Sequence, residues 1–273
     1  MNGLEAFKSQ FRFNPAMAFL VGVERECFTA DEHGTIVPAA PAVLEHIRVN
    51  GWQNPSGPMH GTLVDPGKQV GYELSACQVE TRTNPVRLEN LEAELSYQQQ
   101  ELERSMLSCG FRALYTEVAP DTMPLDVYPD PSGRYATVTA SMPREVLLAA
   151  CQVAGTHIHV GMPDHETALR VYNSVIGETE RLSRLGDHTN GKRLAIYRVV
   201  APQCDPKPYQ SWDEYHALAK AKGFENDPRS CWTLIRIAVH GTIEFRMFGV
   251  TRSAKEIVSW AKECRDLCLE AAG

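Results

Sequence analysis

The segment VGVERECF, residues 21–28, constrains the fold more than any other stretch, because it places two acidic side chains within a pattern typical of a buried β-strand. Side chains alternate along a strand, so Glu24 and Glu26 point to one face and their neighbours to the other. The two carboxylates would lie about 6–7 Å apart and repel one another unless water or a cation intervenes. On this segment alone, a solvated strand face is an equally good interpretation.

The composition is that of an ordinary globular protein with a small-molecule partner. The chain has 273 residues, of which 43% are hydrophobic, so it can bury a sizeable core, and we expect a single domain over residues 1–273. A net charge of −7 and a pI near 5.7 argue against nucleic acid and anionic membranes as partners. The chain contains neither a bilayer-spanning apolar run nor a signal-peptide pattern, which predicts a cytoplasmic protein.

The eight cysteines are scattered without a CxxC pair, which predicts reduced, mostly buried thiols rather than a disulfide framework. Cys264 and Cys268 share a helix face at i,i+4. A metal or redox pair is conceivable there, but core packing beside Trp260 is the simpler prediction.

Apolar and β-branched segments alternate with helical patterns, which predicts an α+β fold with a largely antiparallel sheet. The predicted strands lie in 18–28, 70–80, 111–118, 153–161 and 232–248, and the first predicted helices span 89–110 and 165–185. Two more helices begin with Ser-x-x-Glu capping boxes at Ser211 and Ser253. The Gly- and Pro-rich stretches 50–71 and 126–135 are predicted loops, the first long enough for a lid.

Two further predicted strands carry polar side chains at strand spacing. GTHIHVG, 155–161, places His157 and His159 on one face. GTIEFRMFG, 241–249, places four residues on one face: Thr242, Glu244, Arg246 and Phe248.

In GYELSACQVETRTNP, 71–85, Glu73 and Glu80 are an odd number of residues apart. They can share a face only if a bulge or break separates them.

If these strands are neighbours in one sheet, four or five carboxylates gather on one face and repel by several kcal/mol unless cations neutralise them. Carboxylate-dominated ligation suits Mg²⁺ or Mn²⁺ better than zinc, so two or three such ions are the natural remedy. Taken alone, the HxH segment is more often structural, or a zinc or iron ligand pair.

The conjunction and order of these motifs resemble the glutamate-cysteine ligase family 2, carboxylate-amine ligases with a glutamine synthetase-like catalytic fold. The matching segments are GVERE, ELSACQVETRT, GTHIHVG and CWTLIRIAVHGTIEFR, and SGRY at 132–135 resembles an NPRY-like segment. The resemblance spans most of residues 18–260.

The resemblance implies a curved, mainly antiparallel sheet that has helices on its convex face and holds ATP with two or three Mg²⁺ or Mn²⁺ ions. It implies one ion on Glu26, Glu73 and Glu80, and another on Glu24, Glu244 and one of His157 or His159. Arg246 would meet the transferred phosphate, and Trp232 and Arg236 would contact nucleotide or substrate.

The implied reaction is ATP-dependent amide formation through an acyl phosphate, with glutamate and cysteine or another amine as substrates. ATP is needed because a free carboxylate has no viable leaving group. Basic residues must grip the amino-acid carboxylate, and HTNGKRLAIYR, 188–198, offers Lys192, Arg193 and Arg198. Loop solvation is the simpler interpretation of Lys192.

The sequence differs from the family pattern in two places. These differences leave open which amine is the substrate and which contacts a homo-oligomer would use. LSRLGDHTNGKR stands where a Ser/Asn-rich stretch is usual, and one helix follows the TIEFR strand where members usually have more. The alternatives are a phosphotransferase of the same fold acting on a guanidino-type acceptor, a cupin-type protein holding metal on histidines and a carboxylate, and a relative without activity.

Overall fold

The computed structural model describes residues 3–53, 63–64 and 69–273. Within these ranges seven strands form one antiparallel sheet in the order β4-β5-β1-β7-β9-β8, with β6 pairing beside the end of β1. The strands are β1 Val21–Ala30, β4 Val70–Tyr72, β5 Gln78–Arg82, β6 Arg112–Leu114, β7 Thr156–Gly161, β8 Ile235–Ala238 and β9 Thr242–Phe248; the short β2 Trp52–Gln53 and β3 Leu63–Val64 pair separately.

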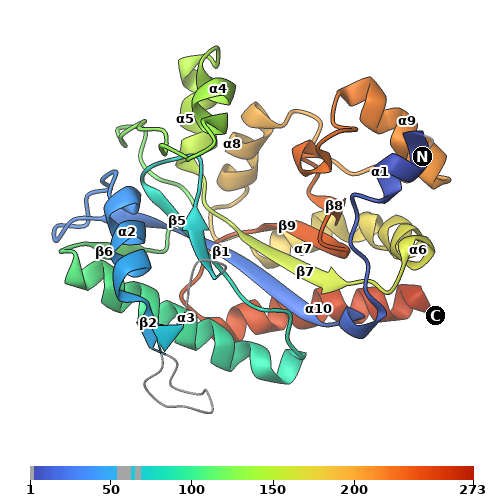
Figure 1. Ribbon diagram of the computed structural model, residues 1–273, viewed down its shortest axis with the longest axis horizontal. Helices are drawn as coiled ribbons and strands as arrows, with labels where there is room; N and C mark the ends of the chain where they lie inside the picture. The colour runs from blue at the N-terminus through green and yellow to red at the C-terminus, as the bar shows by residue number, and fades with distance from the viewer. Residues whose placement is uncertain (1–2, 54–62, 65–68) are drawn as a thin grey trace.

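Helices lie on both sides of this sheet, as Figure 1 shows, with α3 and α10 along one face and α4, α5 and α8 beyond the other. The helices are α1 Gly3–Lys8, α2 Ala40–Asn50, α3 Leu88–Ser108, α4 Arg134–Thr139, α5 Arg144–Gln152, α6 His165–Val175, α7 Thr179–Leu185, α8 Lys192–Val200, α9 Trp212–Lys222 and α10 Ala254–Ala272. Short 3₁₀ turns are η1 Pro15–Met17, η3 Ile176–Glu178 and η4 Pro228–Ser230. The expected mixture of helices with an antiparallel sheet is confirmed.

The main core lies between the sheet and the helices α3, α6 and α10. Strand alternation sends Val23 of β1 and Ile158 of β7 into this core, where they meet Leu91 and Leu95 of α3. Trp260 of α10 stacks on Phe248 with ring centroids 5.2 Å apart. Burial of this face fixes the strand register, because a slip of one residue would exchange the two faces of a strand.

Two predicted strands are each interrupted. The segment 70–80 divides into β4 and β5 with a break after Tyr72, and 232–248 is a hairpin of β8 and β9 that turns at Gly241. Gly241 has a φ of 77°, and a Cβ there would lie 2.3 Å from the Arg12 carbonyl oxygen, so glycine is required at the turn. The break after Tyr72 lets Glu73 approach Glu80, as their odd spacing demands.

The prediction that Phe248 shares a strand face with Glu244 is wrong. Thr156 and Ile158 of β7 are two residues apart, but their partners Phe248 and Phe245 are three apart, so β9 carries a bulge. The extra residue turns Phe248 into the core instead of onto the face that carries Glu244.

The other local predictions are largely confirmed. Asp164, Ser211 and Ser253 each cap a helix by accepting a main-chain N–H bond. The predicted helix 165–185 is interrupted by η3, and the predicted loop 126–135 runs into α4 at Arg134. Most of the predicted lid lies in 54–62 and 65–68, outside the described residues.

The cysteines are free, and all but Cys109 are buried. Cys264 and Cys268 lie in the main core beside Trp260, as their helical spacing predicts. In the part of the chain that the structure covers, no helix has the length and apolar character needed to cross a membrane.

The buried leucines of α3 allow a direct test of this packing. Leu95→Ala should lower the free energy of unfolding by about 2–5 kcal/mol, because the side chain is 1% exposed and its removal leaves a cavity. Leu107→Ala, on the same helix but 67% exposed, should change it by less than about 0.5 kcal/mol. Denaturant unfolding measures both values, and equal losses would contradict the assigned core face.

Candidate active site

The face of the sheet that lacks the main core collects the polar residues singled out from the sequence. Antiparallel register sets Glu24 opposite His157, and Glu26 opposite Glu80, on the two sides of β1. On the next strands, Glu244 pairs with His159 on one side and with Arg236 on the other. Glu24 and Glu244, more than 200 positions apart, therefore lie on the two strands that flank β7.

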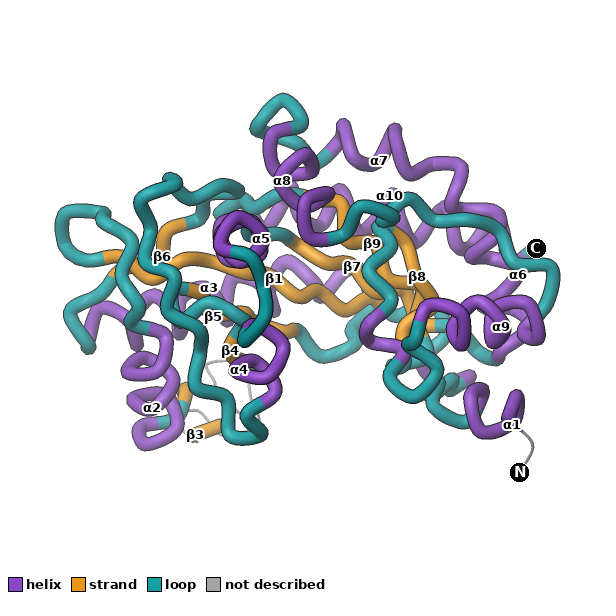
Figure 2. The backbone as a smooth tube through the Cα atoms, turned by 90° about the horizontal axis from the view of Figure 1, so that it is seen from above, coloured by secondary structure: helices purple, strands orange, loops and turns teal. Residues whose placement is uncertain are grey.

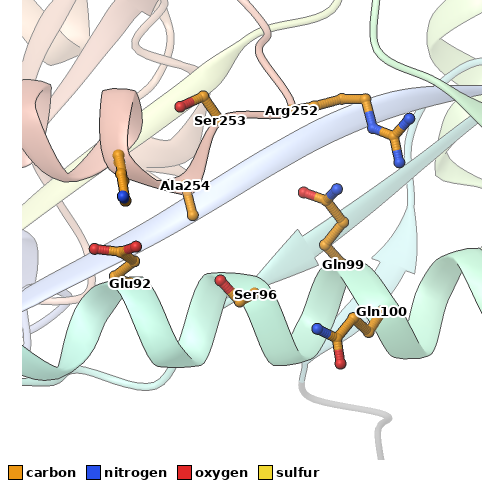
Figure 3. A pocket seen from close by; sticks show the side chains of 8 residues that line it. Glu92, Ser96, Gln99, Gln100, Arg252, Ser253 and Ala254 are labelled. Carbon is orange, nitrogen blue, oxygen red and sulfur yellow. The ribbon is translucent and has the colours of Figure 1, made fainter.

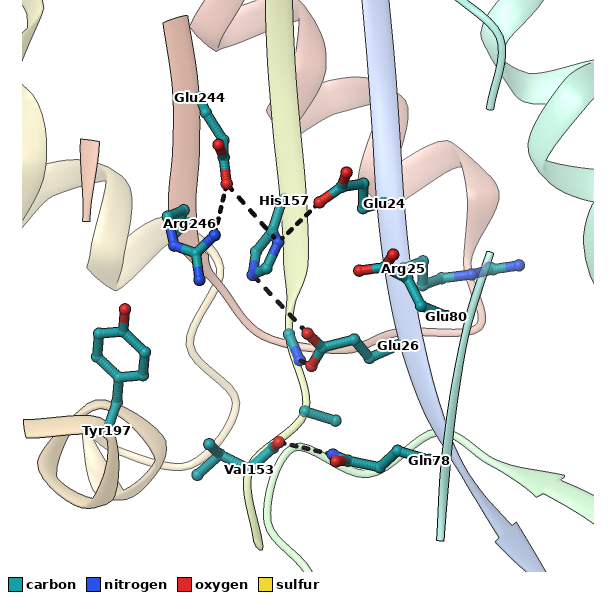
Figure 4. A network of polar contacts seen from close by, with 12 residues as sticks. Glu24, Arg25, Glu26, Gln78, Glu80, Val153, His157, Tyr197, Glu244 and Arg246 are labelled. Carbon is teal, nitrogen blue, oxygen red and sulfur yellow. Dashed lines mark hydrogen bonds and ion pairs between the residues drawn. The ribbon is translucent and has the colours of Figure 1, made fainter. Parts of the chain in front are cut away.

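His157 occupies the centre of this cluster (Figure 4). Its Nδ1 lies 3.2 Å from a Glu24 carboxylate oxygen and 3.9 Å from Glu244, and its Nε2 lies 3.9 Å from Glu26. Burial and the nearby Arg246 guanidinium lower the pKa of His157 below its ordinary value. The neutral imidazole so favoured can offer a lone pair to a cation.

One ring nitrogen of His159 is hydrogen-bonded and the other is not. Its Nδ1 lies 2.8 Å from the Thr242 hydroxyl, while the buried Nε2 has no hydrogen-bond partner in the described structure and lies 3.6 Å from Glu24. A buried nitrogen without a partner is costly, and a ligated metal would satisfy it.

A second acidic group lies toward β4 and β5 and contains Glu26, Glu73 and Glu80. Glu26 accepts a 2.6 Å hydrogen bond from the Gly155 main chain, and Glu80 pairs with Arg82 at 2.5 Å. A side chain at Gly155 would collide with a buried guanidinium, so glycine is needed for this close approach.

These carboxylates are crowded in a site that is poor in water. Burial, followed by the charge of Glu26, raises the pKa of Glu73 to about 7. Burial and the charges of Glu24 and Glu73 raise the pKa of Glu80 well above its usual range. This end of the site is short of positive charge.

Glu244 has the opposite environment. Although burial works against ionisation, the guanidinium groups of Arg236 and Arg246 hold the pKa of Glu244 well below its ordinary value. Arg236 grips the carboxylate with two bonds of 2.6 and 3.0 Å, and Arg246 donates at 2.5 Å. The Nε of Arg246 has no partner among the described residues, so this guanidinium retains donor capacity.

The donor set fits divalent cations. Three groups each bring one oxygen or nitrogen from three residues to within 4.8 Å of one another. They are Glu24, Glu80 and His157; Glu24, His159 and Glu244; and Glu26, Glu73 and Glu80. Carboxylate-rich sets suit Mg²⁺ or Mn²⁺, and one of the three also contains His159. The last two groups are the sets that the family resemblance implied, although their role as ligands stays a prediction.

A pocket of about 330 Å³ opens beside Glu24 and His159. Arg12, Arg82 and His240 also line it, so basic groups face a space next to the acidic cluster. Glu24 lines the same pocket, so its wall carries both signs of charge.

A second pocket lies on the side of the sheet that α3 and α10 cover, between α3 and the start of α10. Figure 3 shows Gln99 and Arg252 at its wall. Beneath it, Arg25 donates a 3.0 Å bond to Gln99 and lies over the Tyr115 ring. This pocket contains none of the site residues predicted from the sequence.

The structure does not gather the three basic residues predicted to grip the substrate. Arg193 is buried, and its guanidinium donates to main-chain carbonyls, among them Ala154 at 2.6 Å. Arg198 pairs with Asp205 at 3.2 Å, and Lys192 is exposed at the start of α8. Arg193 therefore clamps main-chain segments of this fold, and a ligand contact of any of the three residues stays a prediction.

Trp232 lies beside Arg246. Its side chain is 48% exposed, and the Arg246 guanidinium lies 5.7 Å from the ring centroid. The Tyr197 hydroxyl donates to the Trp232 carbonyl and helps to hold this residue at the edge of the site. The prediction of a nucleotide or substrate contact stays open for Trp232.

Sequence reasoning missed Arg82. Arg82 follows Glu80 by two residues, so period-two spacing could have placed it on the same face. Its guanidinium lies against Gly71, opposite Glu80, where a Cβ would come within 2.5 Å of it. Thr242 was predicted on the strand face that carries Glu244, and the pairing of β7 with β9 brings its hydroxyl to 2.8 Å from Nδ1 of His159.

Magnesium should stabilise the folded protein through these carboxylates. In EDTA, Glu73→Gln should raise Tm by about 2–4 °C, because it removes one of several crowded charges, whereas MgCl₂ should raise Tm more for the wild type than for the variant. Glu89→Gln, an exposed change on α3, should behave as the wild type. Thermal unfolding measures these shifts, and an identical Mg²⁺ response of wild type and Glu73→Gln would count against the acidic group as a metal site.

Comparisons with known proteins identify the same family as the motifs. The model of glutamate-cysteine ligase family 2 matches residues 20–177. A candidate glutamate–cysteine ligase 2-1 of Rhodococcus jostii is 26% identical over 90% of this chain and 69% of its own length. A candidate glutamate–cysteine ligase 2 of Gloeobacter violaceus is 30% identical over 40% of this chain and 33% of its own.

A solved structure shares the fold at low identity. A bifunctional glutathione synthetase from Pasteurella multocida aligns with a TM-score of 0.55 and 12% identity over 94% of this chain and 40% of that one. The chain spans 33% to 69% of the length of the curated relatives just named. Because the family model covers more than half of its residues, this chain belongs to the glutamate-cysteine ligase family 2.

Proposed function

We propose that this chain is an ATP- and Mg²⁺-dependent carboxylate-amine ligase that joins the γ-carboxylate of glutamate to cysteine or another amine. The observation that carries the proposal is the convergence of three metal-competent residue groups and Arg246 on one sheet face beside a pocket of about 330 Å³. Membership of the family supports it.

In the proposed reaction, an oxygen of the substrate carboxylate attacks the γ-phosphorus of ATP, and the bond to the bridging oxygen breaks as ADP leaves with its electron pair. The amine nitrogen then attacks the acyl carbon, inorganic phosphate leaves, and the nitrogen gives up a proton to water. Such transfer depends mainly on positioning and on neutralising charge at the phosphoryl oxygens.

Each residue has a physical task in this proposal. Glu26, Glu73 and Glu80 would hold one Mg²⁺, and a second would sit on Glu24, Glu244 and His159. Bound Mg²⁺ supplies positive charge for phosphate oxygens.

Arg246 would donate to the transferred phosphoryl group with the donors that Glu244 leaves free. The pocket lined by Arg12 and Arg82 would take the nucleotide phosphates.

Glu244 is a poor first choice for a mutational test. Glu244→Gln should abolish turnover, but the side chain is fully buried between two arginines, so the loss of its charge would also destabilise the fold by about 3–5 kcal/mol. A substitution at Glu26 separates loss of turnover from loss of stability, because glutamine at this position could still accept the Gly155 N–H bond.

Glu26→Gln should lower kcat/KM by about 100-fold or more, because one metal-binding charge is lost while the local hydrogen bond is kept. The assay screens amino-acid pairs with ATP and Mg²⁺, reading phosphate release and product mass. Glu180→Gln, an exposed change on α7, serves as the control.

Wild-type turnover by Glu26→Gln would refute the role of this carboxylate. ADP formation with a phosphorylated product and no inorganic phosphate would instead indicate the phosphotransferase alternative.

A further inference from the structure

A further group of titratable side chains, separate from the three metal-competent groups, surrounds the loop 186–191 that joins α7 to α8. His188 of this loop stands between carboxylates from two other parts of the chain. Its Nδ1 lies 2.8 Å from Oε1 of Glu117, and its Nε2 lies 2.9 Å from Oε1 of Glu256, in the first turn of α10. Figure 2 shows α7 and α8 at one edge of the molecule.

Two carboxylates at these distances call for a protonated ring. A carboxylate oxygen can only accept a hydrogen bond, and a neutral imidazole has a single N–H to donate. Both ring nitrogens of His188 can donate only when the ring is an imidazolium. Burial opposes this charge, but the hydrogen bonds and charges of Glu256 and Glu117 outweigh burial and raise the pKa of His188 above its ordinary value.

The other charged groups around His188 leave it surrounded mainly by acid. Asp187, its neighbour in the loop, adds a third carboxylate, which also accepts a 2.8 Å bond from the Thr189 main chain. Arg193 is the cation that interacts by charge with Glu117, and its guanidinium donates to main-chain carbonyls. From α10, the uncharged Trp260 ring lies with its centroid 6.1 Å from that of His188.

The two carboxylates that hold His188 differ in burial. The Glu117 side chain is 3% exposed and that of Glu256 is 34% exposed. Glu117 also accepts the main-chain N–H of His188 at 3.1 Å, and its Oε2 has no partner among the described residues. Loss of a donor costs more at a buried carboxylate than at one that water can reach. A neutral His188 should therefore keep its remaining proton on Nδ1, toward Glu117.

We propose that His188 is a pH-sensitive clasp, which as an imidazolium fastens the loop 186–191 to both Glu117 and α10, and which releases Glu256 when it loses a proton. In this step the Nε2–H bond breaks, the proton passes to solvent, and the electron pair stays on Nε2. That lone pair then faces the Glu256 carboxylate and repels it. The clasp does not depend on the proposed reaction.

The clasp lies between α10 and a segment that supports the candidate active site. The loop leads into α8, where Arg193 donates a 2.6 Å bond to the Ala154 carbonyl. The Glu117 carbonyl accepts the Ala154 N–H at 3.0 Å, and the next residue, Gly155, donates to Glu26. Proton loss therefore frees the loop on the α10 side and keeps it fastened on the side of the site.

Nitrogen NMR of the full chain with ¹⁵N-labelled histidine tests the clasp directly, and His188→Gln identifies the resonance. At about pH 6 both ring nitrogens of His188 should carry a proton, and above its titration only Nδ1 should. The titration should also lie at higher pH in the folded chain than in urea. A single ring proton at about pH 6, or a neutral ring protonated on Nε2, would overturn the proposal.

Thermal unfolding gives a second measurement. Because folding raises the pKa of His188, its stabilising effect is complete at low pH and is lost as the pH rises through the folded-state value. Wild-type Tm should exceed that of His188→Gln by about 2–4 °C near pH 6, and by much less near pH 9. His33→Gln, which removes an exposed histidine beside Glu32, is the matched control and should unfold as the wild type. An equal Tm difference at both pH values would contradict the clasp.

Glu256→Gln tests the releasing contact while His188 stays in place. Glutamine can accept from an imidazolium and donate to a neutral ring, so this contact should survive proton loss. The His188 titration should move to lower pH in the variant. In the wild type, amide exchange in 186–191, corrected for intrinsic rates, should accelerate above the titration, and in Glu256→Gln it should not. Identical titration and exchange in the two proteins would refute Glu256 as the partner that His188 releases.

Discussion

The concentration of negative charge on one sheet face is the constraint on which the rest of the site depends. Glu24, Glu26, Glu80 and Glu244 come from strands that are paired side by side, so their separation is fixed by the spacing of the sheet. Side-chain movement offers little relief, because three of the four are mostly buried. Charge compensation must be supplied by other groups held at the same face.

The compensation differs between the two ends of the cluster. At Glu244 it is built into the protein, because two arginines hold the pKa low. Around Glu73 and Glu80, one partly exposed arginine faces several carboxylates, and their pKa values are raised. The acidic end is therefore where an added divalent cation would gain most, and the arginine-rich end is where a phosphoryl group could meet a cationic donor.

Asp227 contacts two arginines, Arg134 and Arg229, as Glu244 contacts Arg236 and Arg246. Burial distinguishes the two: the Glu244 carboxylate is fully covered, whereas that of Asp227 is 34% exposed. A surface ion pair contributes little to stability, whereas removal of one partner of a buried pair is strongly destabilising.

By itself, the sequence determined the strand faces and most of the acidic cluster. Period-two spacing in VGVERECF and GTHIHVG, and the motif order that identified the family, were sufficient for Glu24, Glu26, His157 and His159, because alternation is a local property of the chain. The tertiary structure decided which faces met and which charges found partners. The bulge that buries Phe248, the carbonyl contacts that occupy Arg193, and the meeting of Arg134 with Asp227 all depend on long-range pairing. The sequence alone does not give the distance in space between residues that are a hundred positions apart, so these features follow only from the packed sheet.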